Sequence, residues 1–151
     1  MKFLALLIFA LPYLTHAQQT SWFADAKLGI FIHWGMYAVD GTSESWAFHN
    51  STVPYAQYMH QMKGLHASDY NPAQWAALIK ASGANYCVIT TKHHDGLALF
   101  DTKQITAAAP KNKLWNSNKP LSTVYQTPAK RDLIAPLFVE LEKAGIKKGA
   151  Y

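Results

Sequence analysis

Strand-like segments alternate with helix-like segments along this chain, and that order limits the possible folds more than any other feature. Residues 28–35 and 86–91 are largely apolar runs, and residues 146–151 begin a third segment of strand type. A short apolar run without polar alternation predicts a strand that is buried on both faces, as in a parallel sheet. Because helix-like segments separate the three runs, the sequence predicts a parallel α/β fold.

The first helix-like segment carries the end signals of an α-helix. Asn71 is a residue type that caps helix N-termini, and Pro72 suits the first helical position. Gly83 suits the left-handed conformation that commonly follows the last turn. Apolar side chains recur between these ends at helical spacing, so we expect one face of the helix to be buried.

The second helix-like segment follows a long connection. Residues 101–130 are rich in Lys, Asn, Ser and Ala and predict a surface loop. Leu137 and Leu141 then recur at helical spacing. Because proline is tolerated only within the first turn of a helix, Pro136 predicts that this helix begins near Asp132.

The length of the chain limits how much of a parallel fold it can hold. The chain has 151 residues, enough for about three βα units, whereas a closed (β/α)8 barrel needs about 250 residues. An open three-stranded sheet exposes unpaired backbone groups at its edges. We therefore expect this chain to be a fragment of a larger α/β domain that folds poorly by itself.

Residues 1–17 have the pattern of a signal peptide, which places the folded domain at residues 18–151. A positive charge at Lys2 precedes an apolar run over residues 3–11, and the small residue Ala17 suits a cleavage site. The apolar run is about half of the ~20 residues that a membrane span requires. We expect cleavage near Ala17 and a secreted, periplasmic or lysosomal protein with no membrane span. An uncleaved membrane anchor is the alternative.

Composition and charge exclude several functional classes. Half of the residues are hydrophobic and 15% are charged, which is typical of a globular protein. The formal net charge is +5, but no basic stripe or nucleic-acid motif accompanies it, so we expect no nucleic-acid partner. The single cysteine, Cys87, excludes an internal disulfide and is expected to be a buried hydrophobe. The oligomeric state is left open.

Three histidines follow the predicted strands and are the first candidates for a binding site. His33 lies at the end of the first strand, and His93 and His94 follow the second. In parallel sheets the carboxyl ends of the strands meet at one edge, where ligands bind. Imidazole nitrogens can donate or accept hydrogen bonds, which suits a ligand rich in hydroxyl groups. A histidine that is merely satisfied in the core is the alternative for each.

Metal and cofactor chemistry have weaker support. The set His33, His93, His94 and Asp95 contains ligand types that zinc accepts. However, the sequence has no His-x-His spacing and no cysteine pair, so we expect no metal site. It also has no Gly-x-Ser-x-Gly elbow, phosphate loop or Rossmann glycine set, so we expect no cofactor.

Three segments resemble glycoside hydrolase family 29, the α-L-fucosidases. Residues 22–35 resemble the opening strand of that family, residues 90–96 its second-strand motif, and residues 131–133 the start of the following helix. The resemblance runs from about residue 22 to residue 151. It implies the N-terminal portion of a (β/α)8 TIM-type barrel, and retaining, exo-acting hydrolysis of terminal α-L-fucose from fucosylated glycans.

The resemblance also implies roles for particular residues. His33, His93 and His94 match positions that hydrogen-bond fucose hydroxyls, Trp46 matches a tryptophan beside the sugar, and Glu44 is a further candidate to reach it. The family often has Glu-Trp here, whereas this chain has Glu44-Ser45-Trp46. The nucleophile and the acid/base are expected beyond residue 151, so no catalytic residue is assigned and the chain alone is expected to be inactive. A catalytically dead fucose-binding module is the alternative.

Overall fold

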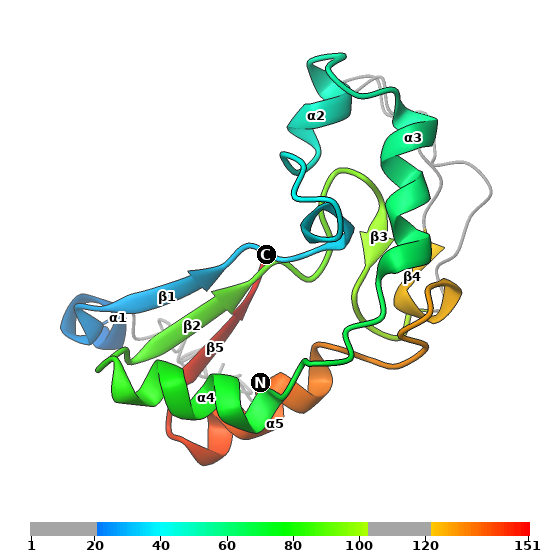
Figure 1. Ribbon diagram of the computed structural model, residues 1–151. Helices are drawn as coiled ribbons and strands as arrows, with labels where there is room; N and C mark the ends of the chain where they lie inside the picture. Colours follow the sequence, from blue (N-terminus) through cyan, green and yellow to red (C-terminus); the bar gives the residue numbers. More distant parts are fainter. Residues whose placement is uncertain (1–20, 103–121) are drawn as a thin grey trace, which may run out of the picture.

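The computed structural model describes residues 21–102 and 122–151, and its centre is a parallel three-stranded sheet (Figure 1). The strands β1 (Gly29–Ile32), β2 (Tyr86–Ile89) and β5 (Lys147–Ala150) lie in the order β1-β2-β5. Both pairings are parallel. This confirms the predicted α/β alternation of strands and helices. The predicted signal peptide and much of the predicted long loop lie outside the described residues.

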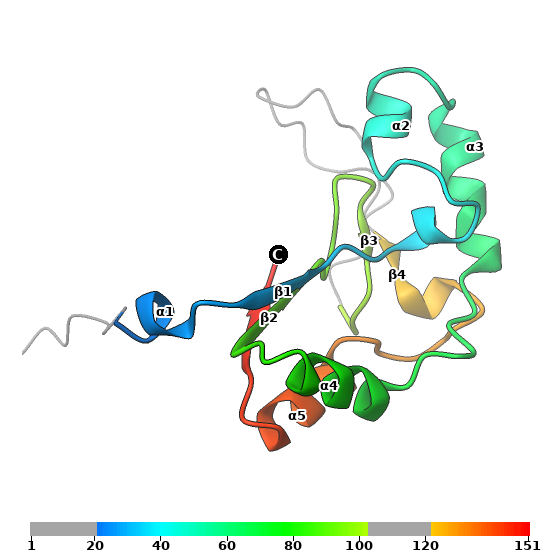
Figure 2. The ribbon, with the colours of Figure 1, turned by 60° about the vertical axis from the view of Figure 1, so that its left-hand side comes forward.

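Two helices, α4 (Pro72–Ala81) and α5 (Ala135–Lys143), pack against each other and cover one face of this sheet (Figures 1 and 2). The remaining described elements are shorter and follow the chain as α1 (Ser21–Ala26), the 3-10 helix η1 (Met36–Ala38), α2 (Trp46–His49), α3 (Tyr55–His60), the 3-10 helix η2 (Gln61–Gly64), β3 (Leu97–Ala98), β4 (Ser122–Thr123) and the 3-10 helix η3 (Val124–Gln126). Strands β3 and β4 form a separate parallel pair. No helix in residues 21–102 and 122–151 is long and apolar enough to cross a membrane.

The ends of α4 follow the predicted signals. The Asn71 side chain accepts a hydrogen bond from the Gln74 N–H at 3.0 Å, which satisfies one of the unpaired donors of the first turn. Pro72 occupies the first helical position. Gly83 has φ +82°, the left-handed conformation that glycine adopts at least cost.

Helix α5 begins at Ala135, three residues later than the sequence predicted. Asp132 lies before the helix, and its Oδ1 accepts hydrogen bonds from the N–H groups of Ile134 and Ala135, at 2.7 and 2.8 Å. A carboxylate with this pattern satisfies donors at a helix start instead of continuing the helix. Pro136 therefore lies in the first turn, as expected.

The prediction that the first strand is buried on both faces is wrong. The face of the sheet that meets the helices carries Cys87 and Ile89, both fully buried. On the opposite face Phe31 is 54% exposed, and its ring packs edge-on against that of Tyr151. An apolar strand sequence is compatible with burial of both faces of the sheet, but the described residues cover only one face.

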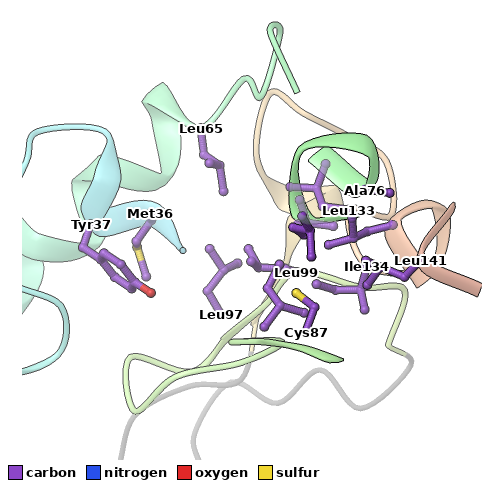
Figure 3. Packing of buried hydrophobic residues seen from close by; sticks show 14 of the residues in the cluster. Met36, Tyr37, Leu65, Ala76, Cys87, Leu97, Leu99, Leu133, Ile134 and Leu141 are labelled. Carbon is purple, nitrogen blue, oxygen red and sulfur yellow. The ribbon is translucent and has the colours of Figure 1, made fainter. Parts of the chain in front are cut away.

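The hydrophobic core continues from the sheet and helices toward the loop segments above the strands. Figure 3 shows Cys87 among Leu99, Ile134 and Leu141, and Met36 and Tyr37 beside Leu97 at the other end of the cluster. This continuity matters for function, because the segment from η1 to α3 is attached to the strand ends through the same packed core. Side chains from that segment are thereby held beside residues that follow β1 and β2.

Candidate functional site

The three predicted histidines lie together at the carboxyl ends of the strands. His33 directly follows β1, whereas His93 and His94 lie in the loop after β2. The ring centroids of His33 and His93 are 5.0 Å apart, and those of His93 and His94 are 4.9 Å apart. The rule that parallel strands bring their carboxyl ends to one edge therefore placed this cluster correctly.

Thr90 ties the two strand ends to each other. Its hydroxyl oxygen accepts a hydrogen bond from the Trp34 N–H at 2.8 Å and donates one to the Trp34 carbonyl at 2.7 Å. Thr90 is almost fully buried. These two bonds fix the backbone after His33 relative to the start of the loop that carries His93.

Glu44 also reaches the cluster. Ligand-type atoms of His33, Glu44 and His93 all lie within 4.8 Å of one another. The Glu44 carboxylate is held by the Trp46 N–H, which donates to its Oε2 at 2.8 Å. Two imidazoles and a carboxylate can form hydrogen bonds to several hydroxyl groups of one small ligand.

Trp46 is not among the side chains that gather in the histidine cluster. It begins α2, its side chain is 52% exposed, and its ring packs edge-on against His49 with 5.0 Å between centroids. In the described part of the chain, the structure thus brings together four of the five predicted binding residues and leaves Trp46 at the margin.

The metal-ligand types that gather in the structure differ from the set that the sequence offered, for which no metal site was expected. The residues that gather are His33, Glu44 and His93, a combination that zinc accepts. Asp95 is not a member of this group: its carboxylate is buried and accepts hydrogen bonds from the Leu97 N–H at 2.8 Å and the Tyr58 hydroxyl at 3.2 Å. Asp95 therefore anchors the histidine loop to α3.

His93 is the most perturbed histidine of the cluster. Its side chain is only 8% exposed. Burial, together with the neighbouring His94 and His33, lowers the pKa of His93 to about 4, while Glu44 opposes this shift. At neutral pH the ring is therefore neutral, so it offers one N–H donor and one lone-pair acceptor.

Three contacts of His93 and His33 were missed in the sequence. The Ser45 Oγ lies 2.5 Å from the His93 Nδ1, Tyr151 stacks on His93 with 5.9 Å between centroids, and Tyr37 packs edge-on against His33 at 5.4 Å. Tyr151 directly follows β5, so the strand-end rule could have found it. In the sequence Ser45 stands out only as a departure from the family motif, and no sequence signal indicates its burial.

The fold and the site together define a parallel α/β protein that presents a polar, histidine-rich cluster of side chains at its strand ends. Comparison with known proteins identifies the family. The family model described as Alpha-L-fucosidase matches residues 12–151. The chain belongs to the α-L-fucosidase family.

Individual relatives agree with this assignment. The chain is 31% identical to the tissue alpha-L-fucosidase of Bos taurus, over 93% of this chain and 30% of the relative. It is similar to the structure of alpha-L-fucosidase isoenzyme 1 from Paenibacillus thiaminolyticus, with a TM-score of 0.72 and 34% identity, over 89% of this chain and 28% of that one.

A second solved structure bears on the chemistry. It is the trapped covalent intermediate of a GH29 alpha-L-fucosidase from Bacteroides thetaiotaomicron in complex with 2-fluoro-fucosyl fluoride, with a TM-score of 0.67 and 30% identity, over 85% of this chain and 28% of that one. The chain thus spans 28–30% of the length of these relatives.

Proposed function

We propose that the complete protein carrying this chain is a retaining, exo-acting α-L-fucosidase that removes terminal α-L-fucose from fucosylated glycans. The observation that carries the proposal is the meeting of His33, Glu44, His93 and His94 at one edge of the sheet. Family membership supports the substrate class, since the matched relatives are named as fucosidases. In this proposal the described sheet and helices form part of a (β/α)8 barrel, and the protein is secreted, periplasmic or lysosomal.

The histidine cluster supplies hydrogen bonds and not the bond-breaking groups. Retaining glycosidases need a nucleophilic carboxylate and a carboxyl acid/base about 5 Å apart. Of the acidic residues near the described site, Asp95 is buried and occupied by Tyr58 and Leu97, while Glu44 lies against two imidazoles. We infer that both catalytic carboxyl groups come from residues after Tyr151, and that residues 1–151 alone do not hydrolyse fucosides.

The covalent intermediate trapped in the Bacteroides relative supports the retaining route. A covalent glycosyl-enzyme is formed by a nucleophilic carboxylate, whereas an inverting enzyme activates water directly. In this chain the sugar-binding side chains would then hold the fucose hydroxyls. The nucleophilic carboxylate, from elsewhere in the protein, would attack the sugar carbon of the glycosidic bond. His33 and His94 are the side chains to replace first, because both are exposed enough to meet a ligand.

The test is hydrolysis of 4-nitrophenyl α-L-fucoside by the complete protein. Loss of one or two sugar hydrogen bonds should lower kcat/KM of His33→Ala and His94→Ala by roughly 10- to 100-fold. His66→Ala is the matched control, because His66 is exposed and lies before α4. Unchanged kinetics in both site variants would refute the assigned roles.

Two other outcomes separate the alternatives. Tight fucose binding with no hydrolysis by the complete protein would identify a catalytically inactive fucose-binding module. The group His33, Glu44 and His93 also has zinc-ligand types, so activity should be measured in strong chelator. Full activity in chelator is expected, and its loss with recovery on adding zinc would replace the proposal with a metal hydrolase.

A further inference from the structure

Three side chains of metal-ligand type meet at the strand ends although they come from separate segments. His33 directly follows β1, Glu44 lies in the loop before α2, and His93 lies in the loop after β2. Each offers one ligand atom, and these atoms all lie within 4.8 Å of one another. Among residues 21–102 and 122–151, this is the one group of three or more His, Cys, Asp or Glu side chains that gathers so closely. It is therefore the place in the described chain to test for a bound metal ion.

The spacing of these atoms is close to the spacing that one zinc ion requires. Zinc binds imidazole nitrogen and carboxylate oxygen at about 2.0–2.2 Å, so the ligand atoms of a tetrahedral site lie roughly 3.4 Å apart. Each pair in the group would therefore have to approach by at most about 1.4 Å. His33 is exposed and Glu44 is half-buried, so rotation of these two side chains can supply that movement.

Two of the three side chains already have a hydrogen-bond partner of the kind that surrounds metal sites. The Trp46 N–H donates to Glu44 Oε2 at 2.8 Å, which leaves lone pairs on the carboxylate for an ion. Ser45 Oγ lies 2.5 Å from His93 Nδ1, so an ion would bind Nε2, and the Nδ1 hydrogen of the metal-bound ring would then point to Ser45. Partners in these positions orient metal-binding side chains before the ion arrives.

The ligand types of the group favour zinc over the commoner divalent ions. Imidazole nitrogen suits zinc, whereas magnesium and calcium prefer oxygen ligands. Glu44 contributes one negative charge, and both imidazoles must be neutral to bind an ion. Lys92 opposes a cation, because its ammonium group donates to the His93 carbonyl at 3.2 Å and places a positive charge nearby. Zinc is therefore to be supplied in a test instead of being expected to copurify with the protein.

We propose that His33, Glu44 and His93 form a binding site for one Zn²⁺ ion, with a fourth position open to water, and that zinc bound there keeps fucose out of the site. Zinc sites with three protein ligands commonly leave such a position open. Binding of the ion rests on the geometry of the three side chains. The exclusion of the sugar rests on the proposed function, because zinc takes the lone pairs and the space that the fucose hydroxyls need. Zinc is thus an inhibitor here, whereas a metal hydrolase would require it.

The first experiment measures zinc binding to the complete protein and does not depend on activity. Protein that has been treated with chelator and dialysed is titrated with zinc chloride at pH 7 by calorimetry. The wild type should bind zinc, and the loss of a ligand in His33→Ala or Glu44→Gln should raise the Kd at least roughly 10-fold. His66→Ala is the control, because His66 is exposed and is not a member of the group. No zinc binding by the wild type, or equal titrations of the wild type and both site variants, would overturn the proposal.

The second experiment uses the wild type alone and tests whether zinc and the sugar exclude each other. On 4-nitrophenyl α-L-fucoside, zinc at about ten times its Kd should raise KM about 11-fold and leave kcat unchanged. Because coupling between ligands is reciprocal, saturating L-fucose should raise the Kd for zinc. An unchanged or lowered KM would overturn the exclusion. If the protein does not hydrolyse fucosides, or does so only with zinc, the proposed function fails while the titration still decides the zinc site, so the two failures remain distinguishable.

Discussion

Replacing His93 with asparagine should remove a pH dependence of stability that the wild-type ring imposes on the folded protein. The ring is 8% exposed, and burial together with His94 and His33 lowers the pKa of His93 from 6.5 to about 4. An asparagine keeps a polar side chain beside Ser45 but cannot be protonated. The difference between the two proteins therefore isolates the titration of this one ring.

The sign and size follow from proton binding. Because the folded-state pKa of His93 lies below the unfolded-state value, the unfolded chain binds more protons between pH 6.5 and pH 4. The stability contribution is complete above about pH 6.5 and is lost as the pH falls toward 4. The full shift corresponds to about 3 kcal/mol, of which about 2 kcal/mol falls between pH 7 and pH 4.5.

Urea denaturation of the complete protein at several pH values measures this effect. The free energy of unfolding of wild type should fall by about 2 kcal/mol more than that of His93→Asn between pH 7 and pH 4.5. Asp95, whose pKa burial raises, contributes with the opposite sign in both proteins and cancels in the difference. His66→Asn, at an exposed position, should follow the wild type. Parallel pH profiles of wild type and His93→Asn would refute the reasoning.

Substitutions at four positions test the fold, each by urea denaturation of the complete protein. Leu137 is fully buried on α5, so Leu137→Ala should lower the free energy of unfolding by roughly 2–5 kcal/mol. Leu78 is 72% exposed on α4, so Leu78→Ala should change it by less than about 0.5 kcal/mol. Equal effects would contradict the described packing. Asn71→Ala removes the cap of α4 and should lower the free energy of unfolding by about 1 kcal/mol. Asn71→Ser should retain most of the stability, because serine also caps helices. Gly29→Ala places a methyl group into the Tyr86 ring and should cost roughly 1–3 kcal/mol; a neutral result would mean that the ring moves aside freely.

The strand and helix order could be predicted because it depends on local patterns. The Asn71–Pro72 start and the Gly83 end of α4 use backbone chemistry that is specific to those residue types. The start of α5 was missed by three residues because Asp132 suits a position just before a helix as well as one inside it. The exposed face at Phe31 could not be predicted, since burial depends on what other segments cover it.

The histidine cluster could also be predicted, but its supporting residues could not. His33, His93 and His94 follow parallel strands, so their meeting depends only on topology. Ser45 reaches His93 through a loop of irregular backbone, where no periodicity reports which side chain turns inward. For Asp95 the residue type alone suggested a metal ligand, whereas its burial against Tyr58 and Leu97 shows an anchoring role.

The most direct test of this account is a crystal structure of the complete protein bound to L-fucose. The account predicts sugar hydroxyls at hydrogen-bond distance, about 2.7–3.2 Å, from nitrogens of His33, His93 and His94, with Nε2 as the His93 atom in contact. It also predicts that Ser45 stays on Nδ1 of His93. Fucose bound at another place, with the three imidazoles contacting only protein groups, would contradict the central claim that this edge of the sheet is the sugar site.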